Sequence, residues 1–288
     1  MRLGIVGMLP GDLRTHTQSH FEAITDLGFT GAGFHFPGHM TAEIEAADIR
    51  RSLNLFSEHQ LDLAQLAVTY RECLFDREAA TRAAVIDTIV RTAQIASDLR
   101  AQYYLIRPGS LNPQGSWTPH RDNHTDESWK LLTDSMSQVA RGLEGLGVTA
   151  VVETHSVSIL RDPETCKEMI DQINSPHIRL VMDYVNHFES LKQVYASRKR
   201  LDRIFDAVGT ASPILHVKDI CIGRGLVIHI DEAIPGEGEL DLVHCLQRFE
   251  ALHPAGYALI EHLKIDDIPT AAINTRKLLA EAGIQSPT

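Results

Sequence analysis

The chain has 288 residues, of which 43% are hydrophobic and 23% charged, and its formal net charge is -11. This composition is typical of a soluble globular protein, and the acidic balance argues against a nucleic-acid partner, which would need a basic surface. No apolar run is long enough to cross a bilayer, so we expect no membrane partner. The four cysteines are scattered without a Cys-x-x-Cys pair, and no secretory signal precedes the first expected strand. We therefore expect a cytoplasmic protein with reduced thiols.

Short apolar runs alternate with segments of helical periodicity along the whole chain. In chain order, the apolar runs predict strands at 3–8, about 31–36, 61–68, 103–106, 148–152, 179–182, 213–215 and 257–261. Apolar residues spaced three and four apart predict helices at 17–27, 41–59, 77–99, 127–146, 163 to about 174, 190–208, 242–252 and 269–282. Two long connections, 107–125 and 220–239, follow the fourth and seventh strands.

Eight strand–helix units predict an α/β fold, a single (β/α)8 TIM barrel that forms one domain over residues 1–288. A doubly wound open sheet is the alternative. Against it, no glycine-rich phosphate-binding pattern follows the first strand. We see no linker or low-complexity stretch that would divide the chain.

The last four expected strands each run into a side chain that can bind a metal ion: Glu153, Asp183, His216 and Glu261. Any one of these residues alone is more often an ion-pair partner or a structural histidine. Because the carboxyl ends of barrel strands surround one opening, we expect the four to share one divalent metal. Three carboxylates and one imidazole favour Mn²⁺ first, with Mg²⁺, Co²⁺ or Zn²⁺ as alternatives.

Five further side chains near these strand ends are candidates for binding the substrate: His155, His187, Arg107, Lys218 and Trp117. The two histidines can hold substrate hydroxyls or, equally, orient a metal ligand. Lys218 can bind an anionic group or pair with Asp219, and Arg107 can bind an anionic group or simply lie on its loop. Trp117 lies in the connection 107–125, whose length is typical of a functional lid, and ordinary loop packing is the alternative.

Several short segments resemble the xylose isomerase-like TIM barrels, which include ketose 3-epimerases, inosose dehydratase and type IV AP endonucleases. The matching segments are 27–31, 151–153, 181–183, 216–219, 235–239 and 259–261. The resemblance implies that the four ligands named above hold one divalent metal. It also implies that Glu153 and Glu261 form an acid–base pair, and that the protein assembles as a homodimer or homotetramer.

The chain departs from these relatives at three places. Asn186 stands where ketose 3-epimerases carry a substrate-binding histidine, and His187 comes one residue later. The nearest arginine after the ligand histidine is Arg224, within a longer connection. His229-Ile230-Asp231 reverses the Asp-x-His order of the nuclease branch, which together with the acidic charge argues against an AP endonuclease.

Two carboxylates beside a metal suit chemistry at a carbon next to a carbonyl. One removes a proton to give a cis-enediolate, and the other returns a proton. The sequence therefore predicts a divalent-metal-dependent isomerase or 3-epimerase that acts on a small-molecule ketose or keto-polyol. The alternatives are a metal-dependent dehydratase of the inosose or 3-dehydroshikimate type, and a noncatalytic sugar-binding subunit. The presence of both glutamates argues against the noncatalytic alternative.

Overall fold

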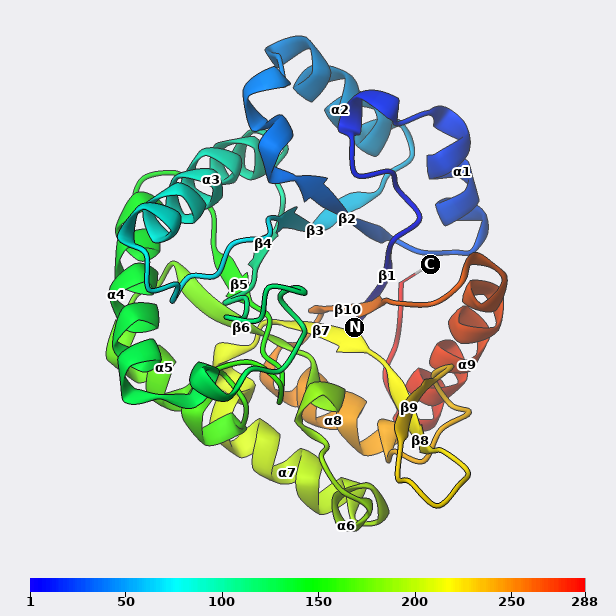
Figure 1. The fold of residues 1–288 in the computed structure, drawn as a ribbon. Coiled ribbons are helices and arrows are strands. Elements are labelled where there is room, and N and C mark those ends of the chain that lie inside the picture. Colours follow the sequence, from blue (N-terminus) through cyan, green and yellow to red (C-terminus); the bar gives the residue numbers. More distant parts are fainter. Residues whose placement is uncertain (288) are drawn as a thin grey trace.

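The computed structural model describes residues 1–287, so the last residue of the predicted domain lies outside the described residues. Eight parallel strands close into a barrel, and helices surround it (Figure 1). Around the barrel, the hydrogen-bonded order is β1-β10-β7-β6-β5-β4-β3-β2. The strands are β1 (Arg2–Val6), β2 (Gly31–Pro37), β3 (Asp62–Thr69), β4 (Tyr103–Ile106), β5 (Ala150–Val152), β6 (Ile178–Met182), β7 (Ile214–Val217) and β10 (Tyr257–Ile260). The predicted (β/α)8 barrel is confirmed.

The helices outside the barrel are α1 (Gln18–Asp26), α2 (Ala46–Glu58), α3 (Ala79–Asp98), α4 (Asp126–Gly142), α5 (Pro163–Ile173), α6 (Leu191–Tyr195), α7 (Ser197–Val208), α8 (Leu242–Leu252) and α9 (Ile268–Glu281). Local sequence explains where several of them begin. Asp162 caps α5 by accepting a hydrogen bond from the Thr165 amide, and Pro163 occupies the first turn. Among residues 1–287, no helix has both the length and the apolar character needed to span a bilayer.

The barrel has an inner and an outer apolar core. The inner core lies within the ring of strands and includes Val151, Val181, Ile214 and Leu259, while the larger outer core fills the space between strands and helices. Closure of the barrel requires a glycine at position 4, where β1 pairs with both neighbouring strands. A Cβ atom there would lie 2.6 Å from Leu259 and 2.8 Å from the carbonyl oxygen of Gly31.

Three predicted segments differ from the structure. The expected helix at 190–208 is divided at Ala196, whose φ of -113° and ψ of 39° are not helical; both halves keep helical periodicity, so the pattern did not reveal the break. A short 3-10 helix, Gly38–Glu43, precedes α2 in place of its expected first turn.

The connection 220–239 contains an antiparallel hairpin, β8 (Asp219–Ile222) and β9 (Ile230–Ala233). Its strands have four residues each and include charged side chains, so their pattern resembles that of a loop. The Asp219 carboxylate accepts hydrogen bonds from the amides of Gly236 and Gly238 and fixes the next turn against the hairpin.

Candidate metal centre

Strand geometry brings the four predicted ligands to one opening of the barrel. Side chains alternate between the two faces of a strand, so a residue two positions beyond an inward-facing residue also points inward. Each ligand follows an inner-core residue by two positions: Glu153 after Val151, Asp183 after Val181, His216 after Ile214 and Glu261 after Leu259. Their ligand atoms lie within 4.8 Å of one another, and all four residues are buried.

His216 lies at the centre of this cluster. Its Nδ1 atom is 2.7 Å from Glu261 Oε2 and 3.5 Å from Asp183 Oδ2. On the other side of the ring, Nε2 is 2.9 Å from Oε1 of Gln65 on β3, a strand that does not neighbour β7, so this amide fixes the orientation of the imidazole from across the barrel. This arrangement leaves Nδ1 facing the carboxylates, as a metal ligand requires.

Lys218 joins the cluster from the position directly after β7. Its Nζ atom is 2.7 Å from Asp183 Oδ2 and 3.2 Å from Glu261 Oε2, and the side chain is buried. The sequence-based alternative for this residue was a pair with Asp219, and that alternative is wrong, because Asp219 holds backbone amides instead. The ammonium group offsets part of the negative charge of the three carboxylates.

Burial and neighbouring charges shift the pKa values of the cluster residues in opposite directions. Burial and the nearby Glu261 raise the pKa of Glu153 to about 7. Burial alone would raise the pKa of Asp183 and Glu261, but Lys218 and His216 lower the pKa of Asp183 to about 2 and that of Glu261 well below its ordinary value. Burial disfavours a charge on His216, yet the carboxylates raise its pKa to about 10. Binding of a cation to this imidazole therefore releases a proton.

These residues fit a divalent cation. Asp183 Oδ1 is buried and has no hydrogen-bond partner among residues 1–287, which is costly for a carboxylate oxygen unless a cation meets it. Three carboxylates and one imidazole, gathered in one buried place, form a group that can hold a divalent metal ion.

The structure places the other candidate residues at different depths. His187 is 3% exposed, its Nε2 is 2.9 Å from Thr154 Oγ1, and its carbonyl oxygen accepts hydrogen bonds from Arg200. This burial favours the supporting role that we had left open for it. His155 is half-buried, and its ring centroid lies 5.7 Å from that of Trp117, which is 39% exposed.

Arg107 follows the inner-core residue Leu105 by two positions and lies at the rim of the barrel. Its Nε donates a hydrogen bond to Ser116 Oγ at 3.0 Å, and its Nη2 donates to the carbonyl oxygen of Tyr70. The guanidinium also lies 4.9 Å from the centre of the Tyr70 ring. It thus ties the connections after β3 and β4 together.

Sequence reasoning missed four residues around the cluster: His35, Gln65, Glu232 and His262. His35 Nε2 lies 3.7 Å, and His262 Nε2 3.8 Å, from Glu261 Oε1, on the side of that carboxylate away from His216. Glu232 of β9 reaches His262 at 3.3 Å. The alternation that revealed the ligands also applies to β2, where His35 follows Gly33 by two positions. For His262, whose φ is 63°, no sequence pattern gave a signal.

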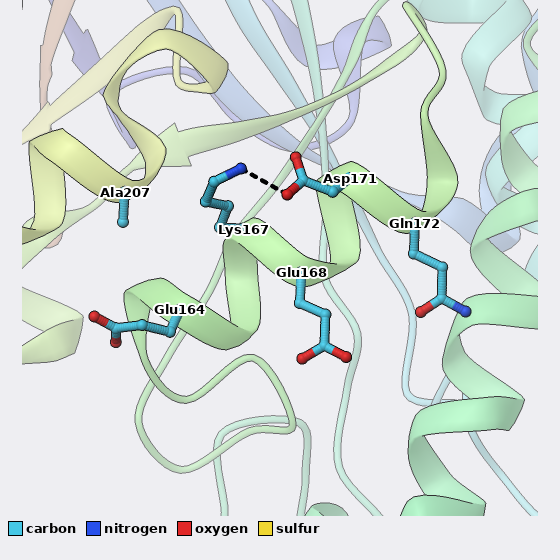
Figure 2. Close-up of a pocket in the computed structure, with 6 residues that line it drawn as sticks. All are labelled: Glu164, Lys167, Glu168, Asp171, Gln172 and Ala207. Carbon is cyan, nitrogen blue, oxygen red and sulfur yellow. Dashed lines mark hydrogen bonds and ion pairs between the residues drawn. The ribbon is translucent and has the colours of Figure 1, made fainter.

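A surface hollow lies on the outside of the barrel, between α5 and α7 (Figure 2). Its volume is ≈ 570 Å³, and its lining residues are Glu164, Lys167, Glu168, Asp171, Gln172 and Ala207. Lys167 and Asp171 pair with each other at 2.6 Å and are exposed. This hollow includes none of the metal-centre residues.

Comparisons with known protein families and solved structures agree with the barrel fold. A family model described as xylose isomerase-like TIM barrel matches residues 21–283. Among curated protein sequences, none matches the chain. The fold is similar to a xylose isomerase-like TIM barrel protein from Mycobacterium smegmatis in complex with magnesium, with 13% identity, a TM-score of 0.74, and 97% of this chain and 95% of that chain covered.

Two further solved structures share the fold over nearly their whole length. One is a D-psicose 3-epimerase in the presence of D-fructose, with 13% identity, a TM-score of 0.70 and 98% of each chain covered. The other is an IOLI protein with a bound zinc atom, with 15% identity, a TM-score of 0.71 and 98% of each chain covered.

Proposed function

Because the chain belongs to the xylose isomerase-like TIM-barrel family, we propose that it is a divalent-metal-dependent isomerase or 3-epimerase of a ketose or keto-polyol. One observation carries the proposal. Glu153 and Glu261 belong to one buried cluster, and their surroundings shift their pKa values in opposite directions, to about 7 for Glu153 and well below the ordinary value for Glu261. Two carboxyl groups at one site can act as an acid and a base when their pKa values differ in this way.

In this scheme, Glu261 is the base that removes the proton from the carbon beside the carbonyl group. Glu153 is the acid that returns a proton, to the opposite face for epimerisation or to the neighbouring carbon for isomerisation. The intermediate between the two transfers is a cis-enediolate of the sugar. Glu153, Asp183, His216 and Glu261 hold the metal, which we propose to be Mn²⁺, with Mg²⁺, Co²⁺ or Zn²⁺ as alternatives. When bound, the metal supplies Lewis-acid polarisation of the carbonyl and of an adjacent hydroxyl.

The remaining candidates take different parts in this proposal. His155, Arg107 and Trp117 contact the sugar at the opening, and His187 supports the residue next to His155 through its hydrogen bond with Thr154. Lys218 binds Asp183 and Glu261, and thereby keeps both carboxyl groups ionised. Further expectations stay predictions: a single domain over 1–288, a cytoplasmic location, a homodimer or homotetramer, and the absence of nucleic-acid and membrane partners.

Deuterium exchange tests the reaction. The protein is loaded with Mn²⁺ in heavy water and incubated with a panel of ketoses and keto-polyols, and mass and proton spectra are recorded. Incorporation of deuterium beside the carbonyl, together with an isomeric product, is the expected result. Loss of water with new ultraviolet absorbance would instead identify a dehydratase. Tight sugar binding with neither exchange nor product would identify a noncatalytic subunit and overturn the proposal.

A further inference from the structure

A second cavity lies at the rim of the barrel. It lies between the connections that follow β3 and β4, and its volume is ≈ 610 Å³. Tyr70, Arg71 and Asp76 line it from the first connection, and Asn112 and Trp117 line it from the second. Its volume falls within the range of small-molecule pockets.

Two contacts link this cavity to the reacting groups. Trp117 lines the cavity, and its ring packs against His155, which follows the ligand Glu153 by two positions. Arg107 also lines the cavity, and the carbonyl oxygen of the preceding residue, Ile106, accepts a hydrogen bond from the Glu153 amide at 2.9 Å. The cavity therefore lies beside the strand end that carries Glu153.

The lining predicts the chemistry of the ligand. Arg71 and Arg107 are balanced by Glu72 and Asp76, so the cavity has no excess of either charge. Arg107 is moreover engaged by Ser116 and by the Tyr70 carbonyl, which leaves it poorly placed to bind an anion.

The rest of the lining is hydroxyl, amide and aromatic. Ser110 and Asn112 are engaged within the loop, whereas Thr81 and Gln114 supply hydrogen-bonding groups, and the half-exposed indole of Trp117 supplies an apolar face. A neutral sugar ring presents both kinds of surface, because its hydroxyls form hydrogen bonds while its C–H face packs on an aromatic ring.

We propose that this cavity is a second sugar subsite, which holds a neutral glycosyl unit attached to the ketose that reacts between Glu153 and Glu261. The substrate class is then a glycosylated keto-sugar rather than a free ketose. The identity of the reacting end rests on the proposed function, whereas binding of the glycosyl unit rests only on the cavity.

Equilibrium binding tests the subsite separately from catalysis. Affinities of the Mn²⁺-loaded protein for D-fructose and for a panel of glucosyl-fructose disaccharides with different linkages are measured by calorimetry and saturation-transfer NMR. We expect at least one disaccharide to bind about tenfold more tightly than D-fructose, with saturation transfer to its glucosyl protons. A panel in which no disaccharide binds more tightly than D-fructose would overturn the subsite.

Blocking the cavity sharpens the test. Thr81 of α3 lines the cavity and has no part in the metal centre, so Thr81→Trp is expected to remove the tenfold preference and leave D-fructose binding unchanged. Ala84→Trp, at an exposed position on the same helix, is the matched control and should change neither affinity.

Preserved disaccharide preference in folded Thr81→Trp would contradict the subsite. If the preference is lost in Thr81→Trp but no sugar exchanges deuterium in the wild-type protein, the subsite stands and the proposed reaction falls.

Discussion

The two halves of the barrel use the same inward-facing positions in different ways. In the half formed by β5, β6, β7 and β10, these positions at the strand ends hold buried ionisable side chains that crowd within 4.8 Å. In the half formed by β1 to β4, the corresponding positions hold the partly exposed His35 and Arg107, beside a cavity. The first half concentrates charge at a free-energy cost, as the proposed acid–base and metal site requires, whereas the second leaves space and hydrogen-bonding groups for the proposed glycosyl unit.

The largest expected effect is on catalysis, when either of the two glutamates in the charged half is replaced. Glu153→Gln and Glu261→Gln are each expected to slow proton exchange by about 10²–10⁴-fold, because the acid or the base is lost. Metal content is measured for both variants, since both residues are also proposed ligands. Glu168→Gln, on the outer surface of α5, is the control. Exchange at the wild-type rate in Glu261→Gln would refute the two-glutamate scheme.

The cost of concentrated charge is tested at Lys218. Lys218→Met removes the buried cation beside Asp183 and Glu261, and the metal-free protein should lose about 3–5 kcal/mol of unfolding free energy. Added Mn²⁺ should restore more stability to this variant than to the wild type, because it replaces the missing positive charge. Urea unfolding with and without the metal measures both effects.

Lys167→Met is the matched control, because it removes an exposed lysine–aspartate pair on α5, and it should cost about 0.5 kcal/mol or less. Equal losses in the two variants would show that the buried cluster has no special dependence on the ammonium.

Lowering the pH tests a second buried group, His187, in the same half of the barrel. Burial lowers the pKa of His187 to about 4 from its ordinary 6.5, so the unfolded chain binds a proton more readily than the folded protein does between these values. Stability from this group is present above pH 6.5 and is lost as the pH falls towards 4, by about 3 kcal/mol in total.

Unfolding free energies of the wild type and His187→Gln, measured from pH 7 to pH 4, should converge as the pH falls. His229→Gln, in the exposed loop of the hairpin, should follow the wild type throughout. Parallel curves for the wild type and His187→Gln would contradict the buried neutral imidazole.

The smallest expected effect concerns the hydrogen bond between Gln65, in the β1–β4 half, and the ligand His216. Gln65→Leu removes the hydrogen bond to His216 Nε2, and metal affinity should fall by about 10–100-fold. Gln102→Leu, which lies near Asp62 and Arg2 at the other end of the barrel, should leave it unchanged. Calorimetric titration with Mn²⁺ measures the difference, and unchanged affinity in Gln65→Leu would show that the amide does not orient the ligand.

Much of the fold and the centre of the site could be predicted from local patterns. The apolar runs located all eight barrel strands, and the polar residue that follows each of the last four identified Glu153, Asp183, His216 and Glu261. The residues that were missed have weaker local signals. Gln65 stands alone within an apolar strand, and Glu232 belongs to a hairpin too short and too charged to be recognised.

The sequence by itself determined the alternation of strands and helices and the residue at each strand end, because both depend on periodicity and on neighbours along the chain. Tertiary structure alone decided that Lys218 pairs with Asp183 and Glu261, that His187 is buried against Thr154, and that the loops after β3 and β4 enclose a cavity. These features depend on distances between segments far apart in the chain. Such distances are set by the closure and register of the barrel rather than by any local pattern.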